Sequence, residues 1–123
     1  MEAIFADTNA LIRLFGGDFM VLELMNGKTV FISEITEMEL LCKPNASKED
    51  KKIIQALLDD CIIIPFSQEI KRKAIKIRLS TRMKLMDSII GASAIIAGLS
   101  ILTNDKDFSR LENETDIILL PNQ

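Results

Sequence analysis

The chain has 123 residues, of which 48% are apolar and 27% are charged, and its formal net charge is −3. This length fits one domain, residues 1–123, whose core can form without disulfides. The sequence contains no histidine. That excludes histidine-based acid–base chemistry, Ser–His or Cys–His nucleophile pairs and the usual zinc sites. The longest apolar region, residues 88–102, is interrupted by glycine and serine, so we expect no membrane-spanning segment.

Short apolar runs alternate with segments of helical pattern along the chain. In chain order, the pattern predicts a strand at 3–6, helices at 9–15 and 18–25, a strand at 29–32, helices at 34–41 and 48–59, a strand at 61–64, a basic helix from 67 to 79, an apolar helix from 86 or 87 to 97, and strands at 100–103 and 117–120. Apolar strands alternating with helices indicate an α/β protein with a parallel sheet covered on both faces. Ligands of such sheets bind beyond the carboxyl ends of the strands.

The two cysteines, Cys42 and Cys61, form no CxxC motif. Both lie in apolar sequence surroundings, so we expect reduced core residues of a cytoplasmic protein.

Two aspartates follow predicted strands. Asp7 comes directly after the first strand, and Asp105 comes shortly after the fourth. Either residue could also be a simple turn or helix cap, because aspartate is common at both. Asp107 is expected to cap the turn at residues 108–111.

A third acid, Glu39, lies on a predicted helix. At 100° per residue it shares a face with Ile35, Met38 and Cys42, so we expect a carboxylate within an apolar stripe. Such a group needs a cation or a strong donor as its partner. The alternative is a side chain that reaches solvent or an arginine.

The fourth acid, Asp87, opens the apolar helix. It is either a first-turn acid favoured by the helix dipole or part of a site. Gly91, Ala94 and Gly98 share its face, and these small residues would let the helix pack close to the sheet and hold Asp87 near the strand ends.

The predicted architecture brings these acids, Asp7, Glu39, Asp87 and Asp105, to one edge of the sheet. Carboxylates so close together repel one another unless a cation neutralises them. Oxygen ligands suit Mg²⁺ or Mn²⁺, and such a site can polarise a phosphodiester and activate water.

Seven of the 15 basic residues fall between positions 71 and 84, with no acid among them. They are Lys71, Arg72, Lys73, Lys76, Arg78, Arg82 and Lys84. The stretch is either a solvated helix face or an electrostatic track for a phosphate backbone. The chain has no Trp or Tyr for base stacking, so a nucleic acid bound at this stretch would be held by shape and backbone contacts.

Four segments, in order and suitably spaced, resemble the PIN-domain family, and most of all its VapC-type bacterial toxins. They are residues 4–12 (IFADTNALI), 32–41 (ISEITEMELL), 86–94 (MDSIIGASA) and 102–108 (LTNDKDF). Met86 stands where many relatives have proline before the third acid, a difference that concerns loop geometry.

The resemblance implies a three-layer α/β/α sandwich with a short parallel sheet of four or five strands. It also implies a metal-dependent endoribonuclease that leaves a 5′-phosphate and a 3′-hydroxyl, with a structured tRNA or rRNA as substrate. Asp7, Glu39, Asp87 and Asp105 would be the catalytic quartet that binds Mg²⁺ or Mn²⁺. Thr8, Asn9, Ser33, Thr103 and Asp107 would support it. Toxin members of the family belong to type II toxin–antitoxin pairs, form homodimers and are silenced by a small antitoxin that reaches into the acidic groove.

Two other classes remain open. One is a catalytically silent RNA- or protein-binding module on the same fold, although the presence of all four acids argues against it. The other is an acid-rich phosphatase or phospho-receiver. An aspartyl phosphatase has a second Asp two residues after the first, and Asn9 occupies that position here. A phospho-receiver has paired acids at the first strand and a lysine late in the chain, and this sequence fits that pattern poorly.

Overall fold

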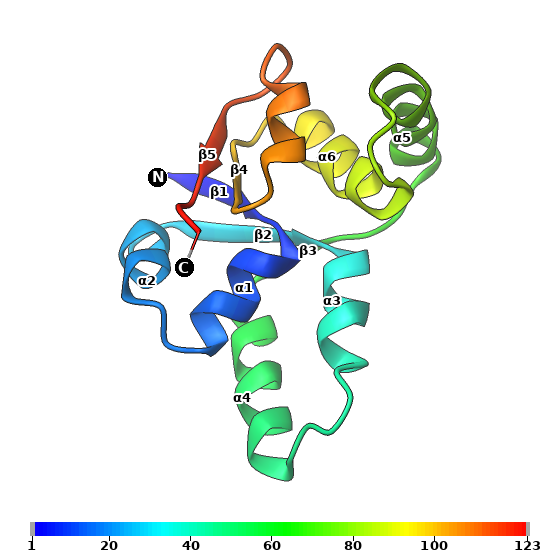
Figure 1. Ribbon diagram of the computed structural model, residues 1–123. Coiled ribbons are helices and arrows are strands. Elements are labelled where there is room, and N and C mark those ends of the chain that lie inside the picture. Colours follow the sequence, from blue (N-terminus) through cyan, green and yellow to red (C-terminus); the bar gives the residue numbers. More distant parts are fainter. Residues whose placement is uncertain (1, 123) are drawn as a thin grey trace.

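The computed structural model describes residues 2–122. A five-stranded parallel sheet is its middle layer (Figure 1). The strands are β1 (Ala3–Ala6), β2 (Thr29–Ser33), β3 (Ile62–Ile64), β4 (Ile101–Thr103) and β5 (Ile117–Leu119). The helices are α1 (Thr8–Phe15), α2 (Phe19–Met25), α3 (Glu34–Leu41), α4 (Lys48–Asp59), α5 (Gln68–Thr81), α6 (Leu85–Ala97) and the 3₁₀ helix η1 (Lys106–Leu111). Every predicted strand and helix is present, with ends shifted by at most two residues.

The strand order is β3-β2-β1-β4-β5. From β1 the chain moves outward to β2 and β3, then crosses back to place β4 on the other side of β1. Phe5 of β1 therefore pairs with Phe31 of β2 and with Ile101 of β4. The order reverses between β1 and β4, and parallel α/β sheets bind ligands at such a reversal point, beyond the carboxyl ends of the strands.

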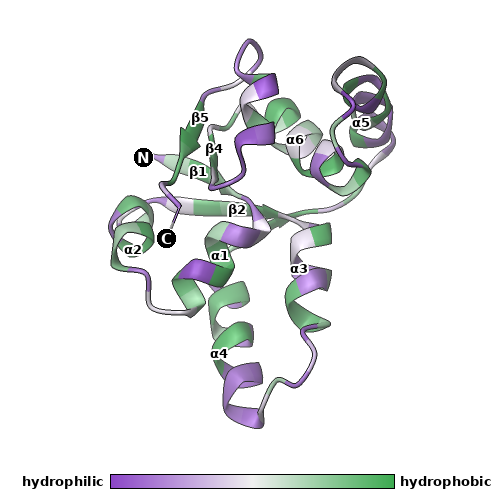
Figure 2. Cartoon of the chain, viewed as in Figure 1, coloured by the Kyte–Doolittle hydropathy of each residue, from purple (hydrophilic) through white to green (hydrophobic). Residues whose placement is uncertain are grey.

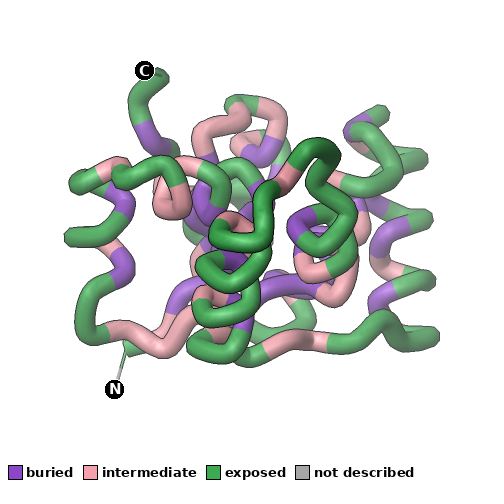
Figure 3. Tube along the Cα trace, turned by 90° about the horizontal axis from the view of Figure 1, so that it is seen from below, coloured by how far each residue is buried: buried purple, intermediate pink, exposed green. Residues whose placement is uncertain are grey.

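Two layers of helices cover the sheet because its strands are apolar on both faces. Ile4 and Ala6 of β1 pack into one core with residues of α1, α2 and α4. Phe5, between them in sequence, points to the other face and packs with α5, α6 and η1, since successive side chains of a strand alternate. Figure 2 shows apolar residues concentrated in the strands and in α6, and Figure 3 shows the buried segments at the centre of the molecule. The three-layer α/β/α arrangement expected from the sequence is confirmed.

Side-chain caps explain where several helices begin. Ser33, Ser47 and Ser67 each accept a hydrogen bond from a backbone N–H in the first turn of α3, α4 and α5, as their residue type favours. No helix within residues 2–122 is long and apolar enough to cross a membrane.

One expectation about the core is wrong for Cys42. Both cysteines are free, but Cys42 is exposed at the end of α3. Cys61 is partly buried, and its thiol donates to the Leu57 carbonyl.

Candidate active site

Asp7 lies at the carboxyl end of β1 and caps α1. Its side chain is almost fully buried, with the residue 3% exposed. Oδ1 accepts a 2.7 Å hydrogen bond from the Thr8 backbone N–H, and Oδ2 accepts a 2.8 Å bond from the Thr103 hydroxyl. Because Thr103 ends β4, the second bond ties together the two strand ends at which the sheet order reverses.

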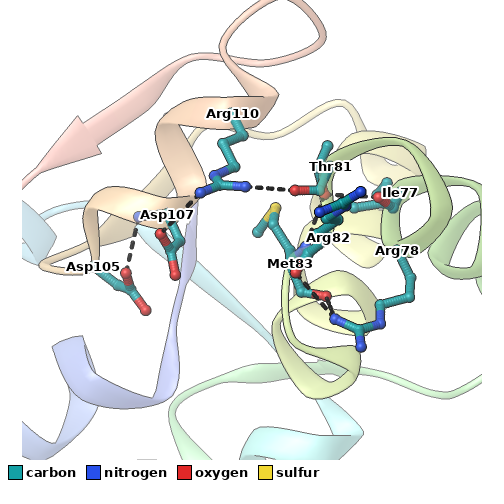
Figure 4. A network of polar contacts seen from close by, with 8 residues as sticks. All are labelled: Ile77, Arg78, Thr81, Arg82, Met83, Asp105, Asp107 and Arg110. Atoms are coloured by element: carbon teal, nitrogen blue, oxygen red, sulfur yellow. Dashed lines mark hydrogen bonds and ion pairs between the residues drawn. The ribbon is translucent and has the colours of Figure 1, made fainter.

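Asp105 lies just beyond the same strand. Its N–H donates to the Thr103 hydroxyl oxygen (3.0 Å), and its Oδ1 accepts from the Asp107 N–H (2.9 Å). The expectation that Asp107 caps the following turn is therefore wrong. The cap is Asp105, because its own backbone is extended and its carboxylate reaches the N–H two residues ahead. In Figure 4 the carboxylates of both aspartates lie on the same side of η1.

Glu39 is held by a pair of threonines. The Thr8 hydroxyl donates to Glu39 Oε1 (2.8 Å) and lies 2.8 Å from the Thr36 hydroxyl. Since Thr8 has one hydroxyl hydrogen and gives it to Glu39, Thr36 donates to Thr8. Thr36 is 0% exposed and is not among the site residues that the sequence predicts. The sequence feature that indicates a role for Thr36 is its position one helical turn before Glu39, which places the two side chains on the same side of the helix.

The predicted apolar stripe around Glu39 is wrong. The face of α3 that is buried carries Thr36 and Leu40, whereas Glu39, Met38 and Cys42 are exposed. The helix has eight residues and meets the core through a narrow stripe. Glu39 therefore lies at the edge of that stripe, where its carboxylate faces solvent and still accepts from Thr8.

Asp87 stands in the first turn of α6. Its pKa is raised, first by burial, then by the negative charge of Asp105 and, more weakly, of Asp107 and Glu39, while Lys84 opposes the shift. At Gly91 the helix comes close to η1, where a Cβ would lie 2.5 Å from Leu111 Cδ1, whereas Ile90 and Ala92 of the same helix pack in one core with Phe5 of the sheet. The prediction that Gly91 lets α6 pack close to the sheet is therefore wrong, because Gly91 faces η1. Gly98 instead ends the helix with a positive φ of 70°.

The four carboxylates act on one another electrostatically. Burial raises the pKa of Asp7 to about 6, and the charges of Asp87 and Asp105 add to that rise. The hydrogen bonds from Thr103 and from the Thr8 N–H work in the opposite direction but do not cancel it. A buried carboxylate surrounded by other carboxylates has a strong need for positive charge.

A groove of about 310 Å³ opens at this point between α1, α3 and the start of α6. It is lined by Asp7, Thr8, Asn9, Ile12, Glu39, Leu40, Cys42, Lys43, Pro44, Met86, Asp87 and Ile90. Three of the four predicted acids line it, together with Thr8 and Asn9. Ser33 and Asp107 are not among the lining residues, and the Ser33 hydroxyl caps α3 through the Ile35 N–H.

The donor set fits a hard divalent cation. All candidate ligands are oxygens, and the buried Oδ1 of Asn104, next to Asp105, has no hydrogen-bond partner. Within residues 2–122, no three acidic or thiol side chains converge tightly enough to form a ready-made metal cage. Mg²⁺ needs only one or two direct carboxylates and keeps several waters. The groove therefore suits a cation held partly through water.

The seven basic residues between positions 71 and 84 lie on α5 and the turn that follows it. Two of them have structural partners: Lys73 forms an ion pair with Glu114, and Arg78 donates to the carbonyls of Arg82 and Met83. Arg110 of η1 donates to the Thr81 carbonyl, so this turn is tied to the element that follows Asp105 (Figure 4).

The fold and the acid-lined groove define a class of doubly wound α/β proteins with a carboxylate site at the reversal point. Within that class, residues 4–114 match the PIN domain family. The chain belongs to this family.

Several solved structures with the same fold come from toxin–antitoxin systems. A chain of a toxin–antitoxin complex from Klebsiella pneumoniae is 29% identical, with a TM-score of 0.81 and 94% of this chain and 95% of that chain covered. A chain of DNA-bound VapBC from Salmonella typhimurium is 21% identical (TM-score 0.80, 96% and 98% covered). A chain of VapBC-5 from Mycobacterium tuberculosis is 20% identical (TM-score 0.69, 99% and 100% covered). Among curated proteins there is no significant match.

Proposed function

We propose that this chain is a Mg²⁺- or Mn²⁺-dependent endoribonuclease and the toxin of a type II toxin–antitoxin pair. It would consist of a single nuclease domain, residues 1–123, acting in the cytoplasm. The observation that carries the proposal is the bond between Asp7 and Thr103, which joins the ends of β1 and β4 beside a groove that Glu39 and Asp87 also line.

Asp7, Glu39, Asp87 and Asp105 are the proposed cation ligands. A divalent cation bound there would supply a positive centre able to polarise a phosphodiester and to activate water. The chain's own hydroxyls keep the carboxylates in place. Thr103 holds Asp7 and the Asp105 N–H, and the relay from Thr36 through Thr8 holds Glu39.

The partners in this proposal are RNA, a small antitoxin and a second copy of the chain. The antitoxin is supported by the relative from Klebsiella pneumoniae, which is part of a toxin–antitoxin complex. An open acidic groove suits a basic antitoxin side chain as well as a cation. The exposed members of the basic stretch, such as Lys71 and Arg72, would bind the RNA backbone by charge.

The direct test is cleavage of a labelled RNA by the purified chain with Mn²⁺ and with EDTA. We expect Mn²⁺-dependent cleavage, and at least a 100-fold loss in Asp7→Asn and in Asp87→Asn, since each removes a proposed ligand. Glu23→Gln on the exposed face of α2 is the matched control. If the wild-type chain binds RNA without cutting it, or if Asp87→Asn cuts at the wild-type rate, the nuclease proposal fails and a silent binding module is favoured.

A further inference from the structure

The groove beside the four acids contains one basic side chain among its lining residues within the described part of the chain. That residue is Lys43, which follows the end of α3. Asp7, Glu39 and Asp87 line the same groove. A polyanion such as RNA meets three carboxylates there, so any positive charge on the rim has a large effect on binding.

Lys43 lies at the end of the groove, four residues after Glu39. It stands just beyond α3, which ends at Leu41. Its Nζ lies 5.7 Å from the centre of the Phe15 ring, at the end of α1. This cation–π contact restrains the long side chain, and Lys43 remains exposed. In Figure 1, α1 and α3 run side by side away from the sheet, and Lys43 bridges their far ends.

The contacts of Lys43 leave it available for a ligand. Of the ion pairs formed within residues 2–122, none involves Lys43. Glu39, one turn earlier, accepts from Thr8 instead. Lys43 therefore lines the same groove as the carboxylates without forming an ion pair with one of them.

The basic stretch on α5 does not line the acidic groove. Its members Arg72, Lys73 and Lys76 line a separate hollow with Ile96 of α6. Ile96 is nine residues beyond Asp87 on the same helix, which corresponds to about 14 Å. Lys84 is near enough to lower the pKa of Asp87, but it is not among the groove-lining residues.

We propose that Lys43 binds the RNA phosphate adjacent to the scissile bond, as a substrate-binding residue at the end of the acidic groove. This assignment rests on the proposed function and deepens it. The carboxylates, with their cation, would hold the phosphate that is cut, and Lys43 would hold the next one, at the end of the groove. The residues of α5 would contact the strand only at a distance from the cut.

The test measures RNA binding apart from cleavage. In an Asp87→Asn background, the affinity for a labelled single-stranded RNA and for an RNA hairpin is measured with Mg²⁺ over a series of KCl concentrations. Lys43→Ala should weaken binding about fivefold at low salt and reduce the salt slope by about 0.7, the effect of one lost phosphate contact. Lys43→Arg should restore both. Lys52→Ala, which removes an exposed lysine from α4, should change neither.

The second test measures cleavage kinetics, and it uses chains in which Asp87 is unchanged. Lys43→Ala should raise KM by about the same factor and leave kcat within about twofold, because the contact is present in both the ground state and the transition state. If Lys43→Ala binds RNA with the same affinity and salt slope as Lys52→Ala, or if the parent protein binds no RNA, the assignment is overturned. If RNA is bound through Lys43 but never cut, Lys43 remains an RNA-binding residue, and the nuclease proposal fails together with the position of this contact next to a scissile bond.

Discussion

The hydroxyl of Thr103 donates a 2.8 Å hydrogen bond to Asp7 Oδ2, across 96 positions of sequence. The same oxygen accepts the N–H of Asp105. A single threonine thus fixes the two acids that follow neighbouring strands, and its loss should affect both.

Thr103→Val keeps the shape of this side chain and removes the hydroxyl. The Asp105 N–H loses its partner, and an unmade buried hydrogen bond costs about 1–3 kcal/mol. The variant should be less stable by that amount in denaturant unfolding. It should also bind Mn²⁺ more weakly, because Asp7 loses a bond that favours its ionised form. Thr103→Ser should recover both properties, and a Val variant with wild-type stability and Mn²⁺ affinity would show that the hydroxyl does not organise the site.

Asp7 should make the metal-free chain less stable as the pH rises. Its pKa is about 6 in the folded chain against an ordinary 3.8, so the folded state retains a proton that the unfolded state has lost. Between about pH 4 and pH 6 the unfolded state binds fewer protons, and stability falls by about 3 kcal/mol over that window. Above pH 6 this contribution is constant.

Denaturant unfolding in EDTA at several pH values measures this effect. Asp7→Asn should remove most of the decline between pH 4 and pH 6 and be more stable than the wild type at pH 7. The Asn amide can keep both contacts, because the Thr103 hydroxyl can accept instead of donating. A wild-type chain whose stability rises over that window would contradict the raised pKa.

Gly91→Ala tests the close approach of α6 to η1. Alanine normally favours a helix over glycine by about 1 kcal/mol. Here the new Cβ would lie 2.5 Å from Leu111 Cδ1, and Leu111 is buried. We expect a net loss of about 1–2 kcal/mol from this overpacking. Adding Leu111→Ala should reverse the sign of the Gly91→Ala effect, since it makes room for the methyl group. If Gly91→Ala is stabilising on its own, the tight contact is wrong.

The two cysteines should differ in reactivity. Burial and the nearby Asp60 charge raise the pKa of the Cys61 thiol to about 11, which leaves little of the reactive thiolate at pH 8. Cys42 is exposed and lines the acidic groove. Iodoacetamide followed by mass spectrometry should label Cys42 at least about tenfold faster. Equal labelling rates would contradict this difference in environment.

The strands and the positions of Asp7 and Asp105 could be predicted from sequence because both signals are local. An apolar run that ends in an aspartate is visible in six or seven residues, and the parallel sheet then brings such ends together. The position of Asp87 in the first turn of α6 was predicted for the same reason.

Features that depend on which helix face meets the core could not be predicted in this way. The face of α3 that packs inward carries Thr36, which looks polar in sequence and is buried because it bonds to Thr8. The apolar stripe that the sequence predicts around Glu39 therefore lies on the wrong face of the helix. The cap of η1 was assigned to Asp107 instead of Asp105, because choosing between two nearby aspartates requires the backbone angles. The basic stretch is evident in sequence, whereas Lys43 becomes notable only once α1 and α3 lie side by side.

Calorimetric titration of the metal-free chain with Mn²⁺ measures whether Asp7 and Asp87 hold one cation. We expect a saturable site in the wild-type chain that is weakened at least about tenfold in Asp7→Asn and in Asp87→Asn, since removing one ligand from a shared site weakens the whole site. Glu23→Gln should bind Mn²⁺ as the wild type does. Wild-type Mn²⁺ binding in both aspartate variants, with the fold intact, would contradict a shared cation site at the ends of β1 and β4.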